Sequence, residues 1–309
     1  MLRTLLASLL LLALPLVGYA QSAVNLAPGT NSSNVPYNSF PEDLSGVGGT
    51  LFFSAYEDGS NGDYTRVVWA SDGTLPGSRV VQPDVTFSSS FGGFVDLNGT
   101  AFYIADDGTN GNELWKSDGT EAGTQMVKDI WPGSSSSFVG GRDISDVTVY
   151  KNQVFFPADD GTNGLELWKS DGTAAGTQMV KDINTSGDAD VGNLIVAGNT
   201  LYFVATDGGS GFELWKSDGT EGGTSMVNLN PGQYGASINE MAAAGGTLYL
   251  SCICGGGVGT EIWKSDGTAS GTVLLKDIET GTASSNPDEL RAMNGNLFFA
   301  VNGEDLWTS

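Results

Sequence analysis

The sequence contains no histidine among its 309 residues. This absence excludes Ser-His-Asp and Cys-His catalytic arrangements built within the chain, and it excludes histidine-based metal centres. Catalysis would have to use paired carboxylates, as in glycosidases, or a bound cation. No set of acids stands out in the sequence for either purpose. The sequence therefore predicts a protein that is not an enzyme.

Basic residues are also scarce, with 13 Lys and Arg against 36 Asp and Glu and a formal net charge of −23. Nucleic acid is therefore excluded as a partner, because duplex binding needs a basic surface that displaces counterions. Anionic membrane surfaces are disfavoured for the same reason. The acidity fits either solubility outside the cell or the binding of divalent cations, and both readings stay open.

Long apolar runs are missing except at the start of the chain. Residues 1–20 place Arg3 before an apolar run from Leu5 to Val17 and end on small residues at Gly18 and Ala20. This layout is typical of a cleavable secretory signal, and the run is shorter than the roughly 20 residues that span a bilayer. We predict that residues 1–20 are a signal peptide. Residues 21–309 then form a single domain that is secreted or extracellular, at the cell surface or in the periplasm, and that is not an integral membrane protein.

The chain has only two cysteines, Cys252 and Cys254. One residue separates them, so on a strand both side chains point to the same face. A secreted location permits a disulfide, but a bridge over this spacing on an extended strand is strained. The pattern favours two partly buried thiols over a bridge. A two-thiol metal site is a third alternative, although two ligands do not complete a zinc site.

Glycine is abundant at 45 residues, and the chain is built from repeats. Near-identical copies read GNELWKSDGTEAGTQMVKDI at 111–130, GLELWKSDGTAAGTQMVKDI at 164–183 and GFELWKSDGTEGGTSMVNLN at 211–230. Weaker copies cover 67–81 and 261–278, and a sixth begins before Trp307. Six marker tryptophans recur every 44 to 53 residues. They are Trp69, Trp115, Trp168, Trp215, Trp263 and Trp307.

Each repeat has the pattern of four short antiparallel strands joined by tight turns. In one unit these are NLIVA (193–197), LYFVA (201–205), FELWKS (212–217) and SMVNL (225–229). Four-stranded units at this period are typical of β-propeller blades. The sequence predicts an all-β, six-bladed β-propeller of four-stranded antiparallel blades. The SDGT turns and the tryptophans are predicted to be structural.

The two ends of the chain indicate how the ring closes. The segment SAVNLAPGTNSSNVP at 22–36 matches the fourth-strand segment and following loop of other units, such as MVNLNPG at 226–232 and VKDIWPGSSSS at 127–137. The last repeat, in contrast, stops after its third strand. We expect the strand from Val24 to Leu26 to pair with the strand from Leu306 to Ser309. This pairing completes the sixth blade and removes an open edge.

The ELWKSDGT core resembles the ELWxxDGT repeat family of secreted bacterial β-propeller-like proteins over essentially all of residues 21–309. The motif is specific as a label of the family. The resemblance implies a propeller-like secreted protein, but it implies no activity for particular residues.

The turns between second and third strands carry acids that are candidate Ca²⁺ ligands, because hard cations prefer carboxylate and carbonyl oxygens. These loops lack the ligand spacing of an EF-hand, so hairpin turns with solvated acids are the alternative. The same position is Cys254 in the fifth unit and Asn302 in the sixth, which excludes a ligand set common to all blades. The candidates are Asp106, Asp107, Glu113, Asp159, Asp160, Glu166, Asp207 and Glu213.

The variable loops between blades, at 131–145 and 184–193, are the expected place of function. We predict a secreted non-enzymatic binding or scaffolding module that recognises an extracellular glycan, surface polymer or protein through loops on one propeller face. The alternative is a metal-dependent hydrolase or lyase at the channel mouth, which rests on fold analogy alone. Its candidate acids are Asp96, Asp146, Glu240, Asp288 and Glu289.

Overall fold

The computed structural model describes residues 41–58, 64–74, 76–82, 92–140, 142, 144–303 and 305–309. Apart from one 3-10 helix, η1 (Ile144–Asp146), the regular elements in these ranges are all β-strands. The prediction of an all-β protein is confirmed. In the described part of the chain, no helix is long and apolar enough to span a membrane.

The strands form six antiparallel sheets that follow one another along the chain, and we number the sheets 1 to 6. Sheet 1 contains β1 (Glu42–Val47), β2 (Thr50–Asp58), β3 (Tyr64–Ser71) and β4 (Arg79–Gln82). Sheet 2 contains β5 (Val95–Leu97), β6 (Thr100–Asp106), β7 (Asn112–Ser117) and β8 (Gln125–Lys128). Sheet 3 contains β9 (Thr148–Tyr150), β10 (Gln153–Asp159), β11 (Leu165–Ser170) and β12 (Gln178–Lys181).

The second half of the chain repeats this order. Sheet 4 contains β13 (Gly192–Ala197), β14 (Thr200–Thr206), β15 (Phe212–Ser217) and β16 (Ser225–Val227). Sheet 5 contains β17 (Ser237–Ala244), β18 (Thr247–Ile253), β19 (Glu261–Ser265) and β20 (Val273–Lys276). Sheet 6 has three described strands, β21 (Pro287–Met293), β22 (Asn296–Val301) and β23 (Asp305–Thr308). The four-stranded unit is confirmed in sheets 1 to 5.

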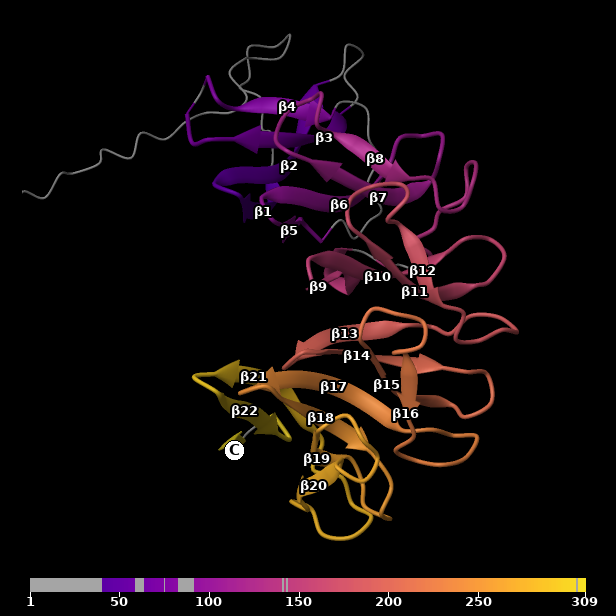
Figure 1. Cartoon of the computed structure of the whole chain (residues 1–309). Helices are drawn as coiled ribbons and strands as arrows, with labels where there is room; N and C mark the ends of the chain where they lie inside the picture. Colours follow the sequence, from indigo (N-terminus) through magenta and orange to yellow (C-terminus); the bar gives the residue numbers. More distant parts are fainter. Residues whose placement is uncertain are drawn as a thin grey trace, which may run out of the picture.

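The first strands of the six sheets lie next to one another in chain order, from β1 through β5, β9, β13 and β17 to β21. Figure 1 shows them along the inner side of an arc of sheets, with the fourth strands on the outer side. This is a propeller-like arrangement. No hydrogen-bonded pairing in the described ranges joins sheet 1 to sheet 6. The predicted closing strand, Val24–Leu26, lies outside the described residues.

The hydrophobic core lies between consecutive sheets. Leu167 in β11 is fully buried in a cluster that also holds Phe203 and Trp215 of sheet 4. In the same way, Leu214 in β15 packs in a cluster with Leu250 and Trp263 of sheet 5. The nearly continuous apolar runs of the sequence follow from this packing, because both faces of an inner sheet are covered.

The SDGT turns after the third strands are fixed by their own side chains. The Oδ1 atom of Asp171 accepts hydrogen bonds from the backbone N–H and the hydroxyl of Thr173, at 2.9 and 2.7 Å. The following Gly172 has φ of 87°, which favours glycine. The hydroxyls of Ser170 and Thr177 then join the two ends of the turn at 2.7 Å. The predicted structural role of this motif is confirmed.

Candidate functional site

The glutamate of the ELW motif is a buried carboxylate that holds the loop to the next sheet. In β11, Oε2 of Glu166 accepts a hydrogen bond from the N–H of Ile183 at 2.8 Å. Its Oε1 accepts from the N–H of Asn184 at 3.0 Å. Glu213 in β15 accepts from the N–H groups of Leu229 and Asn230 in the same way, at 2.8 and 3.1 Å. These carboxylates anchor the start of the connections from sheet 3 to sheet 4 and from sheet 4 to sheet 5.

Glu113 in β7 makes the same contacts with Ile130 and Trp131, and it also accepts a hydrogen bond from the hydroxyl of Ser137 at 2.7 Å. Burial raises the pKa of Glu113 and of Glu166 to about 7, and it also raises the pKa of Glu213. The hydrogen bonds to these carboxylates oppose the rise without cancelling it. The pKa values of Glu113 and Glu166 therefore lie well above the usual range of a carboxyl group.

The acids that precede these glutamates shape the hairpin turns. Oδ1 of Asp160 accepts from the N–H groups of Thr162 and Asn163, at 2.9 and 2.8 Å, and Asp107 does the same in sheet 2. Asp207 accepts from Gly209 and Ser210, and these bonds hold the pKa of its carboxyl below the usual range.

Asp106 and Asp159 complete the set of predicted calcium ligands. Each accepts a hydrogen bond at 2.7 Å from the backbone N–H two residues later, at Gly108 and at Gly161. In the part of the chain that the structure describes, no three Asp, Glu, His or Cys side chains gather so that they could hold a metal ion. The predicted ligands thus lie in the expected hairpins, where backbone N–H groups contact them. Calcium binding by these residues stays a prediction.

The two cysteines occupy the corresponding turn of sheet 5. Cys252 and Cys254 form a disulfide, with the Cα atoms 5.4 Å apart. The preference for two free thiols is therefore wrong. Cys254 stands at the chain position of Asp107, Asp160 and Asp207, and it is 6% exposed. The disulfide thus closes a turn in which no aspartate is present to accept the backbone N–H groups.

The inner strands carry the other group of acids that the sequence pointed to. The pairing of β1, β13, β17 and β21 with their second strands is interrupted by a register shift near the start of each inner strand. Asp43, Asn193 and Glu289 lie at these shifts with φ between 52° and 56°. Bulges of this kind turn side chains out of the regular alternation and are common near active sites.

An arginine links two of the predicted channel acids across sheets 5 and 6. Nη1 of Arg291 in β21 donates to Oε1 of Glu240 in β17 at 3.2 Å, and Nη2 donates to Oε2 of Glu289 at 2.7 Å. Oε1 of Glu240 also accepts from the N–H of Leu290 at 3.1 Å. Arg291 is 66% exposed, so the network is accessible to solvent. The sequence showed only scattered arginines and gave no sign of this link.

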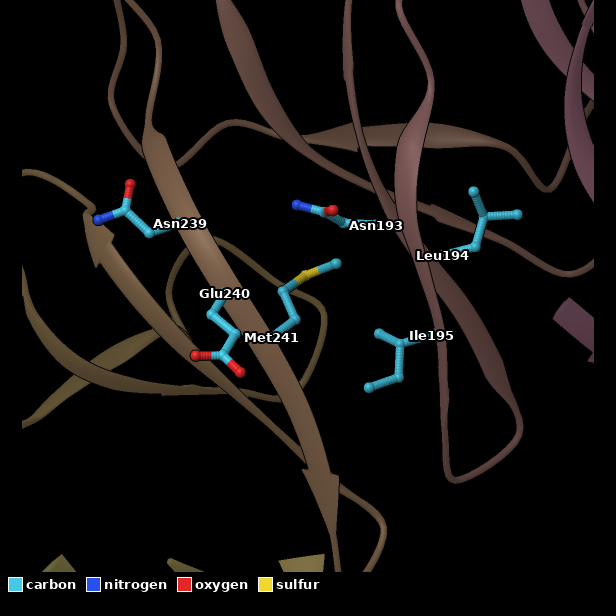
Figure 2. Close-up of a pocket in the computed structure, with 6 residues that line it drawn as sticks. All are labelled: Asn193, Leu194, Ile195, Asn239, Glu240 and Met241. Atoms are coloured by element: carbon cyan, nitrogen blue, oxygen red, sulfur yellow. The ribbon is translucent and has the colours of Figure 1, made fainter. Parts of the chain in front are cut away.

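Glu240 also lines a pocket of about 170 Å³ between β13 and β17. Its other lining residues are Asn193, Leu194, Ile195, Asn239 and Met241. Figure 2 shows the side chains of Asn193 and Met241 pointing into the space between the two strands. The same view shows the carboxylate of Glu240 on the side of β17 away from β13, so the side chains that face this space are amide and apolar groups.

The remaining channel acids are not part of this network. Asp96 accepts hydrogen bonds from the N–H groups of Gly99 and Gly48, at 2.7 and 3.3 Å, and so joins the turns of sheets 2 and 1. Asp288 is exposed in β21. Asp146 in η1 accepts a hydrogen bond from Arg142 at 3.5 Å, and both line a second pocket of about 460 Å³.

The second pocket brings together the two loops in which function was expected. Its lining comes from Val139, Gly140 and Arg142 of the loop before η1, and from Asp188 and Asp190 of the loop before β13. Asp188 is already used locally, because its Oδ1 accepts from the N–H of Leu165 at 3.0 Å. The loops therefore meet, and the wall they form contains both aspartates and an arginine.

No protein-family model matches this sequence, and no curated protein matches it. Several solved structures are similar to it. A structure from an analysis of two prolyl endopeptidases has 12% identity and a TM-score of 0.50, covering 84% of this chain and 39% of that chain. Puromycin hydrolase has 13% identity and a TM-score of 0.47, covering 87% of this chain and 46% of that chain.

The β-propeller domain of the Trilobed protease from Pyrococcus furiosus has 8% identity and a TM-score of 0.45, covering 87% of this chain and 82% of that chain. The chain spans less than half the length of the endopeptidase and puromycin hydrolase chains. At these identities the similarity shows the fold alone.

These structures correct two predictions. The chain was expected not to be an enzyme, and to be a non-enzymatic binding or scaffolding module, but the solved proteins that it resembles are hydrolases. Both predictions relied on the missing histidine. That absence excludes a catalytic triad contained within this chain, but it does not exclude that the propeller serves a hydrolase.

Proposed function

We propose that the protein takes part in a hydrolase reaction on peptides, as the propeller that receives the substrate at its inner strands. The observation that carries this proposal is the Glu240–Arg291–Glu289 network beside the pocket between β13 and β17. Its two carboxylates can bind the ammonium group at the amino end of a peptide, and its guanidinium can bind the carboxylate at the other end. The triad that other hydrolases use needs a histidine, so this chain binds and orients the peptide instead of attacking it.

The charges of the site favour the amino end of a peptide. Two carboxylates face one guanidinium in the network, and the whole chain has a net charge of −23. A free ammonium group is attracted by this field and donates hydrogen bonds to Glu240 and Glu289. The apolar side chains of Ile195 and Met241 then accept the first side chain of the peptide.

Calorimetric titration of the purified protein with short peptides tests this function. Peptides with a free amino end should bind, and N-acetylation should weaken binding at least tenfold. Glu240→Gln should weaken it to a similar degree, whereas Glu121→Gln, the same change at an exposed turn, should leave it unchanged. The proposal fails if no peptide binds, or if acetylated and free peptides bind equally.

We also infer that the six sheets close into a ring and that residues 1–20 direct the chain out of the cell. The series of neighbouring inner strands supports the ring, and the apolar run after Arg3 supports secretion. The ELWKSDGT repeats support membership of the ELWxxDGT family. Small-angle scattering of the purified protein tests the ring, because a closed ring has a smaller radius of gyration than an open arc.

A further inference from the structure

The outer edge of sheet 6 differs from the edges of the other sheets. Its third strand, β23, has β22 as its only hydrogen-bonded neighbour within the described ranges, whereas the third strands of sheets 1 to 5 each pair with a fourth strand. Leu306 in β23 is 78% exposed. Its counterparts before the marker tryptophan in sheets 2 to 5 are Leu114, Leu167, Leu214 and Ile262, and all are 0% exposed. An apolar edge of this kind needs a partner strand.

We propose that β23 is the docking site of residues 22–27 of the same chain, in the register that β16 has on β15. The sequence SAVNLAPG at 22–29 has the same residue as SMVNLNPG at 225–232 at six of eight positions. In sheet 4, Val227 pairs with Leu214, Met226 with Trp215 and Ser225 with Lys216. The same register places Val24 opposite Leu306, Ala23 opposite Trp307 and Ser22 opposite Thr308. This inference rests on the ring closure proposed above and adds its register.

Side chains of sheets 5 and 6 are in place for this strand. Asp305 stands at the position of Glu213, whose carboxylate accepts the N–H groups of Leu229 and Asn230. The corresponding donors are the N–H groups of Leu26 and Ala27. In sheet 4, Leu214 is buried in one cluster with Val227 and Leu229. Val24 and Leu26 would cover Leu306 in the same manner.

A lysine of sheet 5 lies where it can contact the residue that precedes the docked segment. Lys181, at the end of β12, donates to the carbonyl oxygen of Thr224, the residue before β16, at 3.1 Å. Lys276 is its counterpart at the end of β20, and its Nζ atom lies 4.4 Å from the ring centre of Trp307. The carbonyl that corresponds to that of Thr224 belongs to Gln21. Lys276 is therefore positioned to bind the residue that precedes the docked strand.

The length of the chain fits a strand from the same molecule. Connections between a fourth strand and the next first strand have from nine residues, at 228–236, to nineteen, at 129–147. A strand that ends at Val24 leaves seventeen residues, 25–41, before β1. This length lies within the range of the other connections, so the same chain can supply the strand without a second copy.

Engineered cysteines test the register. The double variant Ser22→Cys with Thr308→Cys should form an intramolecular disulfide in most molecules under mild oxidation, mapped by mass spectrometry of peptides. The matched control, Ala23→Cys with Thr308→Cys, should not, because neighbouring residues of a strand point to opposite faces. Equal yields in the two variants, no bridge in either, or a bridge between two copies would overturn the proposal.

Two further measurements separate this proposal from ring closure. A compact scattering profile together with a failed Ser22–Thr308 bridge would overturn the register and leave the ring in place, whereas an extended profile would overturn both. In addition, Leu306→Asp should lower the Tm by several degrees, because docking buries Leu306. Met293→Asp, at a side chain 57% exposed in the same sheet, should leave the Tm unchanged. Equal Tm values for the two variants would count against docking.

Discussion

The Nζ atom of Lys169 donates a hydrogen bond to the carbonyl oxygen of Gly219 across 2.8 Å. Lys169 belongs to the third strand of sheet 3, and Gly219 belongs to the SDGT turn of sheet 4. Lys116 and Lys216 make the same bond to Gly172 and Gly267, each at 2.7 Å. The repeated lysine therefore ties every one of these sheets to the next, which explains why the ELWKSDGT core contains both the donor and the acceptor.

Removing this link should reduce stability without changing the fold. Lys169→Met keeps the aliphatic length but loses the donor, so the free energy of unfolding should fall by about 1 kcal/mol. The exposed Lys264 occupies the same motif position in sheet 5, and Lys264→Met is the matched control. Urea unfolding of the two variants measures the difference. Equal losses in the two variants would show that the bond to Gly219 contributes nothing.

The ELW glutamates predict a specific pH dependence. Burial raises the pKa of Glu166 from 4.5 to about 7, so the folded state binds this proton more tightly than the unfolded state. The stabilising contribution of the carboxyl is therefore present below pH 4.5 and is lost as the pH rises to 7. The difference in unfolding free energy between the wild type and Glu166→Gln should fall by roughly 1 to 3 kcal/mol across this window.

Denaturant unfolding at half-unit pH steps measures this difference. Glu221→Gln changes an exposed acid in an SDGT turn and should give a difference from the wild type that stays constant. Because both oxygens of the Glu166 carboxyl accept a backbone N–H bond and the NH2 group of glutamine cannot accept one, the glutamine variant should also be less stable than the wild type at low pH. A wild-type advantage that grows with pH would contradict the raised pKa.

The repeats made the fold predictable. Trp168 and its counterparts recur at one strand position, and a period near fifty residues with four strands per unit leaves few architectures. The buried role of Glu166 was not predictable, because its hydrogen-bond donors, Ile183 and Asn184, lie beyond the next strand of the same sheet. From sequence alone, an acid after an Asp-Gly turn cannot be distinguished from a metal ligand. The recurrence of glutamate before the Leu-Trp pairs of sheets 2, 3 and 4 was the available signal.

The network of Arg291 could not be predicted for a related reason. Its partner Glu240 is 51 residues away and lies on a different sheet. The register shift near Glu289 sets the direction of these side chains, and the regular alternation of a strand gives no warning of a bulge. Channel acids could be listed from the loops, but only the packing of β17 against β21 decides which of them meet.

The disulfide between Cys252 and Cys254 predicts the behaviour of sheet 5. Because the bridge closes a very short loop, its reduction should lower the free energy of unfolding by only about 1 to 2 kcal/mol. Both cysteines are nearly fully buried, so reduction should be slow in the folded protein. Thiol titration in denaturant without reductant should detect no free thiol from these two residues. Two titrating thiols would restore the interpretation that the structure replaced.

A calcium ion at the acidic hairpins has to compete with hydrogen bonds that the carboxylates already accept. Asp160 already accepts three hydrogen bonds, two from backbone N–H groups and one from the amide of Asn163 at 2.8 Å. A carboxylate has about four lone-pair positions, so an ion must use the remaining one or displace the amide.

An ion that binds only the folded state stabilises it by mass action, so millimolar Ca²⁺ at constant ionic strength should raise the Tm, and chelator should reverse the rise. Asp160→Asn should reduce this gain. Asp171→Asn, the same change in an SDGT turn at the other end of β11, should keep the full gain. Differential scanning calorimetry with Ca²⁺, Mg²⁺ and chelator measures each of these shifts. If Asp160→Asn lowers the Tm by the same amount with calcium and with chelator, the carboxylate serves only to fix the turn, because the loss then comes entirely from its bonds to Thr162 and Asn163.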